Sequence, residues 1–365
     1  MKSDLLISEL ATQFTYFLKS TPDTNEVPRS FSEADGLMLG SPQYWTCGFP
    51  PGSLWYMYEL TGDEKWKDAA TVNTLKLDEA KNRTNTHDLG FIIFCSYGNA
   101  FRITGIEDYK NVIIEASDTL IKRFNPAVGC LRSWDWGDWK FPVIIDNVMN
   151  LEMLFWVSKI TGESKYRDVA LRHADATMQN HYREDFTCCH VVDYDPDSGQ
   201  VIQKQTHQGL SDESAWARGQ AWGFYGYVMC YRETKNEQYL DFAQKIAAYI
   251  LDNAPDDMIP HWDYDAPQVS EEPRDASAGS LIASALYELS EYVPTKSEFY
   301  IRNADRILES LSSKNYRAEI GTNGGFLLLH STGNKPGGSE IDSSINYADY
   351  YYLEALKRQI QIKNS

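Results

Sequence analysis

The sequence predicts an all-α protein, a toroidal barrel of six helical hairpins, from two observations. A short Thr-Gly pattern that joins helix-like segments recurs along the 365 residues, and about twelve segments have helical periodicity. Twelve helices make six hairpins, and six hairpins can close into a ring of inner and outer helices. An open solenoid is the alternative, but solenoids have more regular periods and polar caps.

The recurring pattern is typical of a helix–turn–helix corner. Clear copies begin at Thr61, Thr104 and Thr161, and degraded copies begin at Thr234 and Thr295. In the clear copies a glycine ends one helix with positive φ, an acidic residue follows, and an aromatic residue in the next first turn covers the corner. The irregular spacing of the copies indicates loops of different length between repeated hairpins.

Apolar periodicity on either side of these corners places the individual helices. They are expected at 5–19, 52–61, 64–80, 88–103, 109–123, 144–160, 164–180, 214–232, 237–253, 275–292, 298–313 and 346–361. Segments before a corner, such as 144–160, are apolar nearly all round, whereas segments after one, such as 164–180, are amphipathic and charged. We therefore expect the first kind to form the inner ring and the second kind the outer ring.

Two stretches depart from the helical pattern. Residues 188–206 have the pattern of a β-hairpin around the turn at 195–199, which predicts a small β-hairpin insertion near 186–206. Residues 321–344 are irregular and rich in glycine. Because the chain contains no evident linker or low-complexity segment, residues 1–365 are expected to form a single domain.

Charge and composition exclude several classes of partner. The chain has 34 Lys and Arg against 52 Asp and Glu, a net charge of −18, which argues against nucleic acid and anionic membranes. Its longest nearly apolar stretch, 221–231, is far too short to span a bilayer. Six cysteines without C-x-x-C spacing predict buried thiols and a cytoplasmic protein, or a periplasmic one if a signal peptide was removed. We expect a monomer or a small homo-oligomer.

Two aspartates are candidate catalytic acids. Asp88 follows His87 at the start of one inner helix, and Asp146 starts the next. A carboxyl group in apolar surroundings has a raised pKa and can act as a general acid near neutral pH. Two such groups at one barrel mouth suit the cleavage or hydration of a glycosidic-type bond. The alternative interpretation of each aspartate alone is a helix cap.

Further candidates follow from residue types that are costly to bury. Arg218 lies in an apolar segment and needs an anionic partner, and Trp222 shares its helix face at i, i+4. A planar cation beside an aromatic ring suits a sugar carboxylate. Trp45 and Trp134 lie in loops, where tryptophans often bind ligands, although both could fill a core. No histidine cluster has metal-ligand spacing, and no nucleophile elbow, P-loop or dinucleotide motif is present.

Taken in order, the motifs resemble those of the unsaturated glucuronyl hydrolases, glycoside hydrolase family 88. The matching segments are 45–49, 52–55, 87–91, 145–151, 206–209, 216–223 and 349–356. The resemblance implies a six-hairpin α/α barrel that forms a single catalytic domain. It also implies hydration of the C4=C5 double bond in the unsaturated uronic acid that polysaccharide lyases leave at the non-reducing end, with release of the adjacent sugar. The implied partner is an unsaturated uronyl oligosaccharide, and no metal or organic cofactor is implied.

The resemblance also implies roles for single residues. Asp146 matches the general acid/base and Asp88 its partner. The residues that match the lining of the family's pocket are Trp45, His87, Trp134, His190, Gln208, Arg218 and Trp222. Lys335 and Ser339 lie where family members differ in reading the next sugar and its sulfate, although a flexible loop is the alternative there. The choice among chondroitin, hyaluronan and heparan fragments stays open.

Three other functions remain as alternatives. An unsaturated rhamnogalacturonyl hydrolase would share the barrel and the chemistry but act on pectin fragments. A sugar epimerase on the same barrel would need paired inward histidines, and a second one is not evident. A helical-repeat binding module would need no carboxyl pair. It would catalyse no reaction, and its sugar binding would be unchanged in Asp146→Asn.

Overall fold

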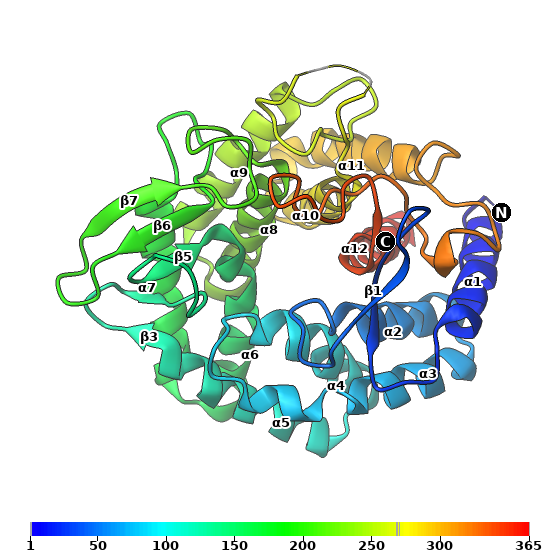
Figure 1. The fold of residues 1–365 in the computed structure, drawn as a ribbon, viewed down its shortest axis with the longest axis horizontal. Coiled ribbons are helices and arrows are strands. Elements are labelled where there is room, and N and C mark those ends of the chain that lie inside the picture. The colour runs from blue at the N-terminus through cyan, green and yellow to red at the C-terminus, as the bar shows by residue number, and fades with distance from the viewer. Residues whose placement is uncertain (1, 268, 270, 365) are drawn as a thin grey trace. The chain divides into compact units, whose positions relative to one another are not determined.

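The computed structural model describes residues 2–267, 269 and 271–364. They fall into two compact units. Helices and strands of both are labelled in Figure 1. The first unit comprises residues up to 76, residues 254–262 and residues from 266 onward, and the second comprises 77–253 and 263–265. The single domain expected over residues 1–365 stays a prediction.

The first unit contains six α-helices among its described residues. They are α1 (Lys2–Ser20), α2 (Phe49–Thr61), α3 (Glu64–Leu75), α10 (Ala276–Tyr292), α11 (Ser297–Leu311) and α12 (Asn346–Asn364), with short 3-10 turns η5 (Pro294–Lys296) and η6 (Asn323–Gly325). Helix α2 packs against α3, and α10 packs against α11 and α12. An antiparallel sheet of order β2-β1-β8 joins β1 (Val27–Ser32), β2 (Gly36–Gly40) and β8 (Ser344–Ile345).

The second unit carries the other helical segments and two small sheets. Its helices are η1 (Asp78–Asn82), η2 (Gly90–Gly98), α4 (Asn99–Thr104), α5 (Glu107–Leu120), η3 (Ile121–Arg123), η4 (Ile145–Asn150), α6 (Leu151–Thr161), α7 (Ser164–Asn180), α8 (Ala217–Thr234) and α9 (Glu237–Asp252). Strands β3 (Phe124–Asn125) and β4 (Cys130–Leu131) form one pair, and β5 (Pro142–Ile144), β6 (Val191–Tyr194) and β7 (Val201–Gln205) form an antiparallel sheet.

The helix–turn–helix corners have the geometry that the repeat predicts. Gly62, Gly105 and Gly162 adopt φ values of 67°, 68° and 76°, and each ends a helix in the left-handed region. In the fourth copy Lys235 takes that conformation with φ of 56°. The aromatic residue that follows each corner is buried in all five copies, from Trp66 onward.

Each of the twelve expected segments contains helix, but two inner helices begin differently. The segment expected at 88–103 starts as the π-helix η2, and the segment expected at 144–160 starts as the 3-10 helix η4. The two pack closely: a Cβ on Gly90 would lie 2.6 Å from the Cα of Asn150, whose Oδ1 accepts a hydrogen bond from the N–H of Phe91. Irregular helices of this kind are frequent at functional sites.

The expected β-hairpin is present as β6 and β7. Its third strand, β5, and the separate hairpin of β1 and β2 were not predicted. Strand β5 has only three residues, too few for a periodic pattern, and β1 contains Pro28, which weakens a strand pattern.

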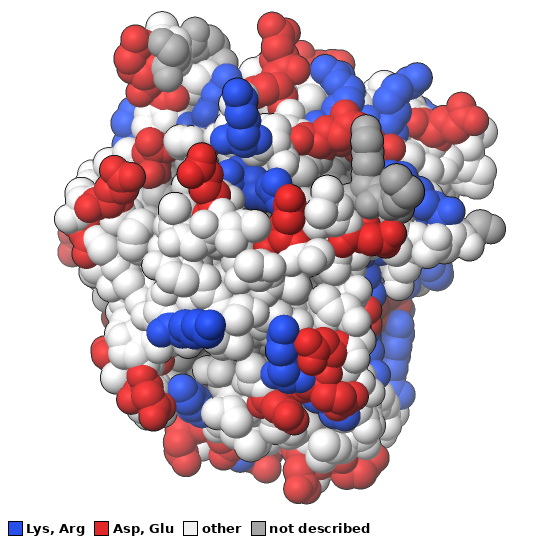
Figure 2. Space-filling view, turned by 90° about the vertical axis from the view of Figure 1, so that its right-hand side faces the viewer, with Lys and Arg blue, Asp and Glu red and all other residues white. Residues whose placement is uncertain are grey.

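Three further observations bear on the partner classes. All six cysteines are buried as thiols that are not joined in disulfides. Within the described residues, no helix is long and apolar enough to cross a membrane. Figure 2 shows acidic and basic side chains interspersed over one face of the molecule.

Candidate active site

Asp146 is a buried carboxylic acid near the start of η4, directly after strand β5. Burial raises its pKa to about 7, and the nearby Arg218 guanidinium and the Trp222 indole N–H work in the opposite direction. The neighbouring carboxylate of Asp88 raises the pKa further. A substantial fraction of Asp146 is therefore protonated at neutral pH, as a general acid requires.

His190 immediately precedes strand β6 and faces Asp146. Its Nε2 lies 3.7 Å from Asp146 Oδ2, while its Nδ1 accepts hydrogen bonds from the backbone N–H groups of His207 (3.2 Å) and Gln208 (3.1 Å). Because Nδ1 is the acceptor of both, the ring proton sits on Nε2. Burial also holds the pKa of His190 well below its usual value. His190 is thus a neutral N–H donor directed at the acid.

The first turn of α8 supplies a buried cation. Arg218 is 1% exposed, and its Cζ lies 4.5 Å from the ring centroid of Trp216. The His190 ring lies 4.4 Å from the same indole. A Cβ on Gly219 would lie 2.6 Å from Trp216 Cε3, so the glycine lets the indole pack against the helix. Trp222, one turn further on, is fully buried and packs against Phe91 at 5.0 Å.

Asp88 is held by its two neighbours in sequence. Its Oδ1 lies 3.2 Å from His87 Nε2, and its Oδ2 accepts a hydrogen bond of 2.5 Å from Thr86 Oγ1. Burial lowers the pKa of His87. The Asp88 carboxylate is therefore oriented by a hydroxyl and an imidazole, and its charge acts on Asp146.

Trp134 is linked to the Asp88 segment through backbone pairing. Thr86 and Trp134 form an antiparallel bridge, and the N–H of His87 donates to the carbonyl of Ser133 at 3.1 Å. The Trp134 ring is buried, and its Nε1 has no hydrogen-bond partner among the described residues. A buried indole N–H without a protein partner is a candidate donor to a polar ligand.

The structure brings eight of the predicted residues into the second unit. They are Asp146, Asp88, His87, Trp134, His190, Gln208, Arg218 and Trp222. Gln208 is half-buried, and its backbone orients His190.

The other three predicted residues belong to the first unit. Trp45 is half-buried against Tyr347, with ring centroids 5.2 Å apart. Lys335 forms a salt bridge with Glu272 and lies 4.9 Å from the ring centroid of Trp262. Ser339 is exposed, and its backbone pairs with that of Asn334 through two hydrogen bonds of 3.0 Å. The segment is therefore a tight hairpin whose lysine already has a carboxylate partner.

Sequence reasoning missed several residues that shape the site. Trp216 is not among the residues that the sequence places in the pocket, yet it lies against both His190 and Arg218. His207 lies in the matching segment 206–209 but is not among the residues expected in the pocket, although its N–H helps to fix the His190 tautomer. Thr86 was also missed. The signal for Trp216 was its position two residues before a buried arginine in an otherwise apolar segment.

The arrangement can protonate a substrate and hold an anionic group. Asp146 supplies a proton, His190 supplies a neutral donor, and Arg218 supplies a buried positive charge. Among the described residues, no group of three or more His, Cys, Asp or Glu side chains is placed to hold a metal ion.

Comparison with known proteins agrees with this chemistry. The family model described as Glycosyl Hydrolase Family 88 matches residues 24–360. An unsaturated glucuronyl hydrolase from Formosa agariphila is 44% identical over 96% of this chain and 89% of its own length. An unsaturated chondroitin disaccharide hydrolase from Streptococcus pneumoniae is 33% identical over 97% of this chain and 90% of its own length.

A solved structure is also similar throughout. The crystal structure of an unsaturated glucuronyl hydrolase specific for heparin aligns with a TM-score of 0.96 and 47% identity, covering 99% of this chain and 98% of that one. The fold class expected from the sequence, an all-α (α/α)6 barrel with small strands inserted, is confirmed by this similarity.

Proposed function

The chain belongs to glycosyl hydrolase family 88, and from that premise we propose which of its residues perform the family's reaction and in which roles. The enzyme hydrates the C4=C5 double bond of the unsaturated uronic acid at the non-reducing end of glycosaminoglycan-type oligosaccharides, and the adjacent sugar is released.

One observation carries the assignment of the acid: Asp146 is a buried carboxyl group whose pKa is raised to about 7. An ordinary aspartate is almost fully ionised at neutral pH and has no proton to give. Burial favours the neutral form, so Asp146 can deliver its proton to C4 of the enol ether. This step leaves positive charge at C5, which the ring oxygen shares.

Water then adds to C5 and returns a proton to the Asp146 carboxylate, so the acid is restored. The product is a hemiketal at C5. Its collapse breaks the bond between C5 and the ring oxygen, which leaves a ketone at C5 and a hydroxyl group on C1. The resulting hemiacetal at C1 expels the neighbouring sugar as an alcohol. His190, with its Nε2–H directed at Asp146 Oδ2, is proposed to orient the carboxylate and the attacking water.

The charged neighbours have distinct proposed roles. Arg218 is the buried cation that pairs with the uronate carboxylate. This local positive charge allows a protein with a net charge of −18 to bind an anionic sugar. Asp88, held by Thr86 and His87, adds to the effect of burial that raises the pKa of Asp146, and it hydrogen-bonds the substrate. Trp222 is fully buried and its indole N–H lowers the pKa of Asp146, so we assign it to orienting the acid rather than to stacking on the sugar.

The pocket lining completes the proposal. Trp134 and Gln208 are assigned to the uronate ring and its hydroxyl groups, and Trp45 to the same substrate by its motif. Lys335 and Ser339 are assigned to the next sugar. Because Lys335 is neutralised by Glu272, a sulfate there would have to compete with a carboxylate for the ammonium group. We therefore propose that substrates without a sulfate at this position are preferred.

The proposal is tested by following the ultraviolet absorbance of the C4=C5 enol. Unsaturated disaccharides from chondroitin, hyaluronan, heparin and pectin are each mixed with the wild-type enzyme and with Asp146→Asn. We expect the absorbance to decay with a glycosaminoglycan substrate and the variant to lose activity on the order of 10²–10⁴-fold. Asp252→Asn, which changes an exposed aspartate at the end of α9, is the matched control and should retain full activity.

Each other outcome has a definite meaning. Decay only with the pectin substrate would indicate an unsaturated rhamnogalacturonyl hydrolase. Sugar binding without decay would favour a binding module, and conversion of a saturated sugar without decay would favour an epimerase. Full activity of Asp146→Asn would exclude Asp146 as the acid.

We further propose that the protein works in the cytoplasm as one catalytic domain and as a monomer or a small homo-oligomer. Six buried thiols that are not joined in disulfides suit a reducing compartment, and the family match spans residues of both units. Cell fractionation tests the location, a single cooperative unfolding transition tests the single domain, and light scattering tests the oligomeric state. A periplasmic fraction would contradict the first point.

A further inference from the structure

Three tryptophans of one loop form a compact aromatic cluster around His207. Trp134 and Trp136 stack with centroids 4.5 Å apart and an angle of 15° between their planes, and Trp139 meets both rings edge-on. The His207 ring lies 5.3 to 6.0 Å from the three indoles. Trp134 is buried, whereas Trp136 is 52% exposed.

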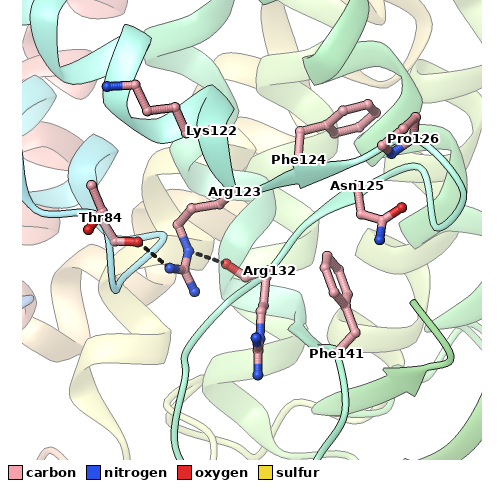
Figure 3. Close-up of a pocket in the computed structure, with 8 residues that line it drawn as sticks. All are labelled: Thr84, Lys122, Arg123, Phe124, Asn125, Pro126, Arg132 and Phe141. Carbon is pink, nitrogen blue, oxygen red and sulfur yellow. Dashed lines mark hydrogen bonds between the residues drawn. The ribbon is translucent and has the colours of Figure 1, made fainter. Parts of the chain in front are cut away.

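The start of this loop is anchored by an arginine (Figure 3). Asp135, between the two stacked tryptophans, accepts two hydrogen bonds of 3.0 Å from Arg123, and Arg132 lies 3.4 Å from the same carboxylate. Arg123 also donates to the carbonyl groups of Thr84 and Arg132, as the dashed lines show. These arginines line a basic pocket of about 420 Å³. Its central cation, Arg123, is therefore already hydrogen-bonded to the loop.

The far side of the loop is fixed as well. Trp139 Nε1 donates a hydrogen bond of 2.8 Å to Gln205 Oε1 at the end of β7. Gly137 turns the chain with φ of 80°, and a Cβ there would lie 2.5 Å from the Trp139 ring. Trp136 is thus presented at the tip of a loop that is tied down on both sides, and little conformational entropy is left to lose when a ligand stacks on it.

From this geometry we propose that the exposed face of Trp136 is a further sugar-binding platform for longer substrates. The inference rests on the proposed function. Trp136 covers one face of Trp134, and rings 4.5 Å apart leave no room for a sugar between them. A sugar on Trp136 is therefore a different residue of the chain from one that contacts Trp134. The platform takes a pyranose beyond the sugar that is linked to the unsaturated uronate.

The chemistry of the platform fits this occupant. An aromatic face binds the C–H face of a pyranose through burial of apolar surface, and the π-system needs no particular hydroxyl pattern. Asp135, which flanks Trp136, is neutralised by Arg123, whose hydrogen bonds lower the pKa of that carboxyl group. It therefore adds little repulsion toward an anionic oligosaccharide.

The test compares substrate lengths. The unsaturated disaccharide and tetrasaccharide of the same repeat are assayed with the wild-type enzyme, Trp136→Ala and Trp136→Phe. We expect Trp136→Ala to lower the ratio of tetrasaccharide to disaccharide kcat/KM about five- to tenfold, mainly through a higher tetrasaccharide KM. Trp136→Phe keeps an aromatic face and should restore most of the ratio. Phe299→Ala removes another exposed aromatic ring, on α11, and should leave the ratio unchanged.

Binding constants in the Asp146→Asn background give a second readout. There the same ratio is measured as dissociation constants by tryptophan fluorescence, so the platform is tested independently of turnover. An unchanged ratio in Trp136→Ala would overturn the platform, and so would an equal loss on both lengths, which would make Trp136 only a support for Trp134. Failure of the proposed function is separate, because it appears as no turnover of any disaccharide by the wild-type enzyme.

Discussion

His190 Nε2 lies 3.7 Å from Asp146 Oδ2, and the His190 tautomer is set on the other side of the ring by two backbone N–H groups. The pair therefore combines a carboxyl group that burial keeps partly protonated with an imidazole that burial keeps neutral. A neutral imidazole can orient the carboxyl group by its N–H without carrying a positive charge, which would favour the ionised form of the acid. The backbone of His207 and Gln208 thus fixes the orientation of the imidazole that faces Asp146.

The rate should decline on the alkaline side of neutrality. The raised pKa of Asp146, about 7, means that the group is protonated below that pH and ionised above it. Since protonation of C4 needs the acid form, kcat/KM should fall about tenfold per pH unit above about pH 7. Initial rates from pH 5 to 9 on the best disaccharide check this. A flat profile up to pH 9 would contradict the assignment of Asp146 as the acid.

The free energy of unfolding should depend on pH because Asp146 is buried. The folded-state pKa of about 7 lies above the ordinary value of 3.8, so the folded protein holds the proton more tightly than the unfolded chain does. Asp146 therefore lowers the free energy of unfolding progressively as pH rises from about 4 to about 7, and the loss persists above that range. The change Asp146→Asn removes this term.

The measurement is the difference in unfolding free energy between Asp146→Asn and the wild type. From pH 5 to pH 8 we expect this difference to shift in favour of the variant by about 2–3 kcal/mol. Asp349, whose pKa burial raises to about 8, depends on pH in the same direction, but it is present in both proteins and cancels. A difference that does not vary with pH would show that Asp146 titrates normally in the folded protein.

Removing the neutral donor should slow the reaction without abolishing binding. His190→Ala deletes the Nε2–H that faces Asp146, and we expect kcat to fall on the order of 10²-fold with a smaller change in KM. His190→Gln offers an amide that can both accept from the 207–208 backbone and donate to the acid. It should recover part of the loss. Equal kcat values for both variants and the wild type would exclude His190 from the reaction, provided that melting temperatures show all three to be folded.

Local patterns in the sequence predicted the helices well because each corner carries its own signal. The hydroxyl group of Thr161 donates to the carbonyl of Val157 and accepts from the N–H of Glu163. One residue therefore stabilises both the end of one helix and the turn before the next. The same pattern at Thr61 and Thr104 uses the same two bonds. Such contacts span only a few residues and can be read from neighbouring letters.

The site was predictable in its residue types but not in its geometry. A buried arginine in an apolar helix and an aspartate at a helix start are visible in the sequence, which is why Arg218 and Asp146 were identified. The His190 tautomer depends on N–H groups 17 and 18 residues away. The Trp134 cluster depends on His207, and Lys335 meets Glu272 across 63 residues. Contacts of that range follow from the fold and have no local pattern.

The Lys335–Glu272 pair should determine how sulfate next to the unsaturated uronate is tolerated. Glu272 accepts hydrogen bonds from both Lys335 and Trp262. Burial raises the pKa of Glu272, but these two hydrogen bonds lower it, and the net pKa lies below the usual value. In Glu272→Gln the ammonium group of Lys335 loses its carboxylate and gains capacity for an external anion. We expect kcat/KM for sulfated disaccharides to rise about tenfold or more relative to unsulfated ones, since a charge-assisted hydrogen bond contributes about 1.5–3 kcal/mol. Lys335→Met combined with Glu272→Gln is the control and should remove the gain. A gain that persists in the double variant, or a ratio unchanged in the single one, would show that Lys335 does not contact the sulfate and that its role is to hold Trp262 and the hairpin.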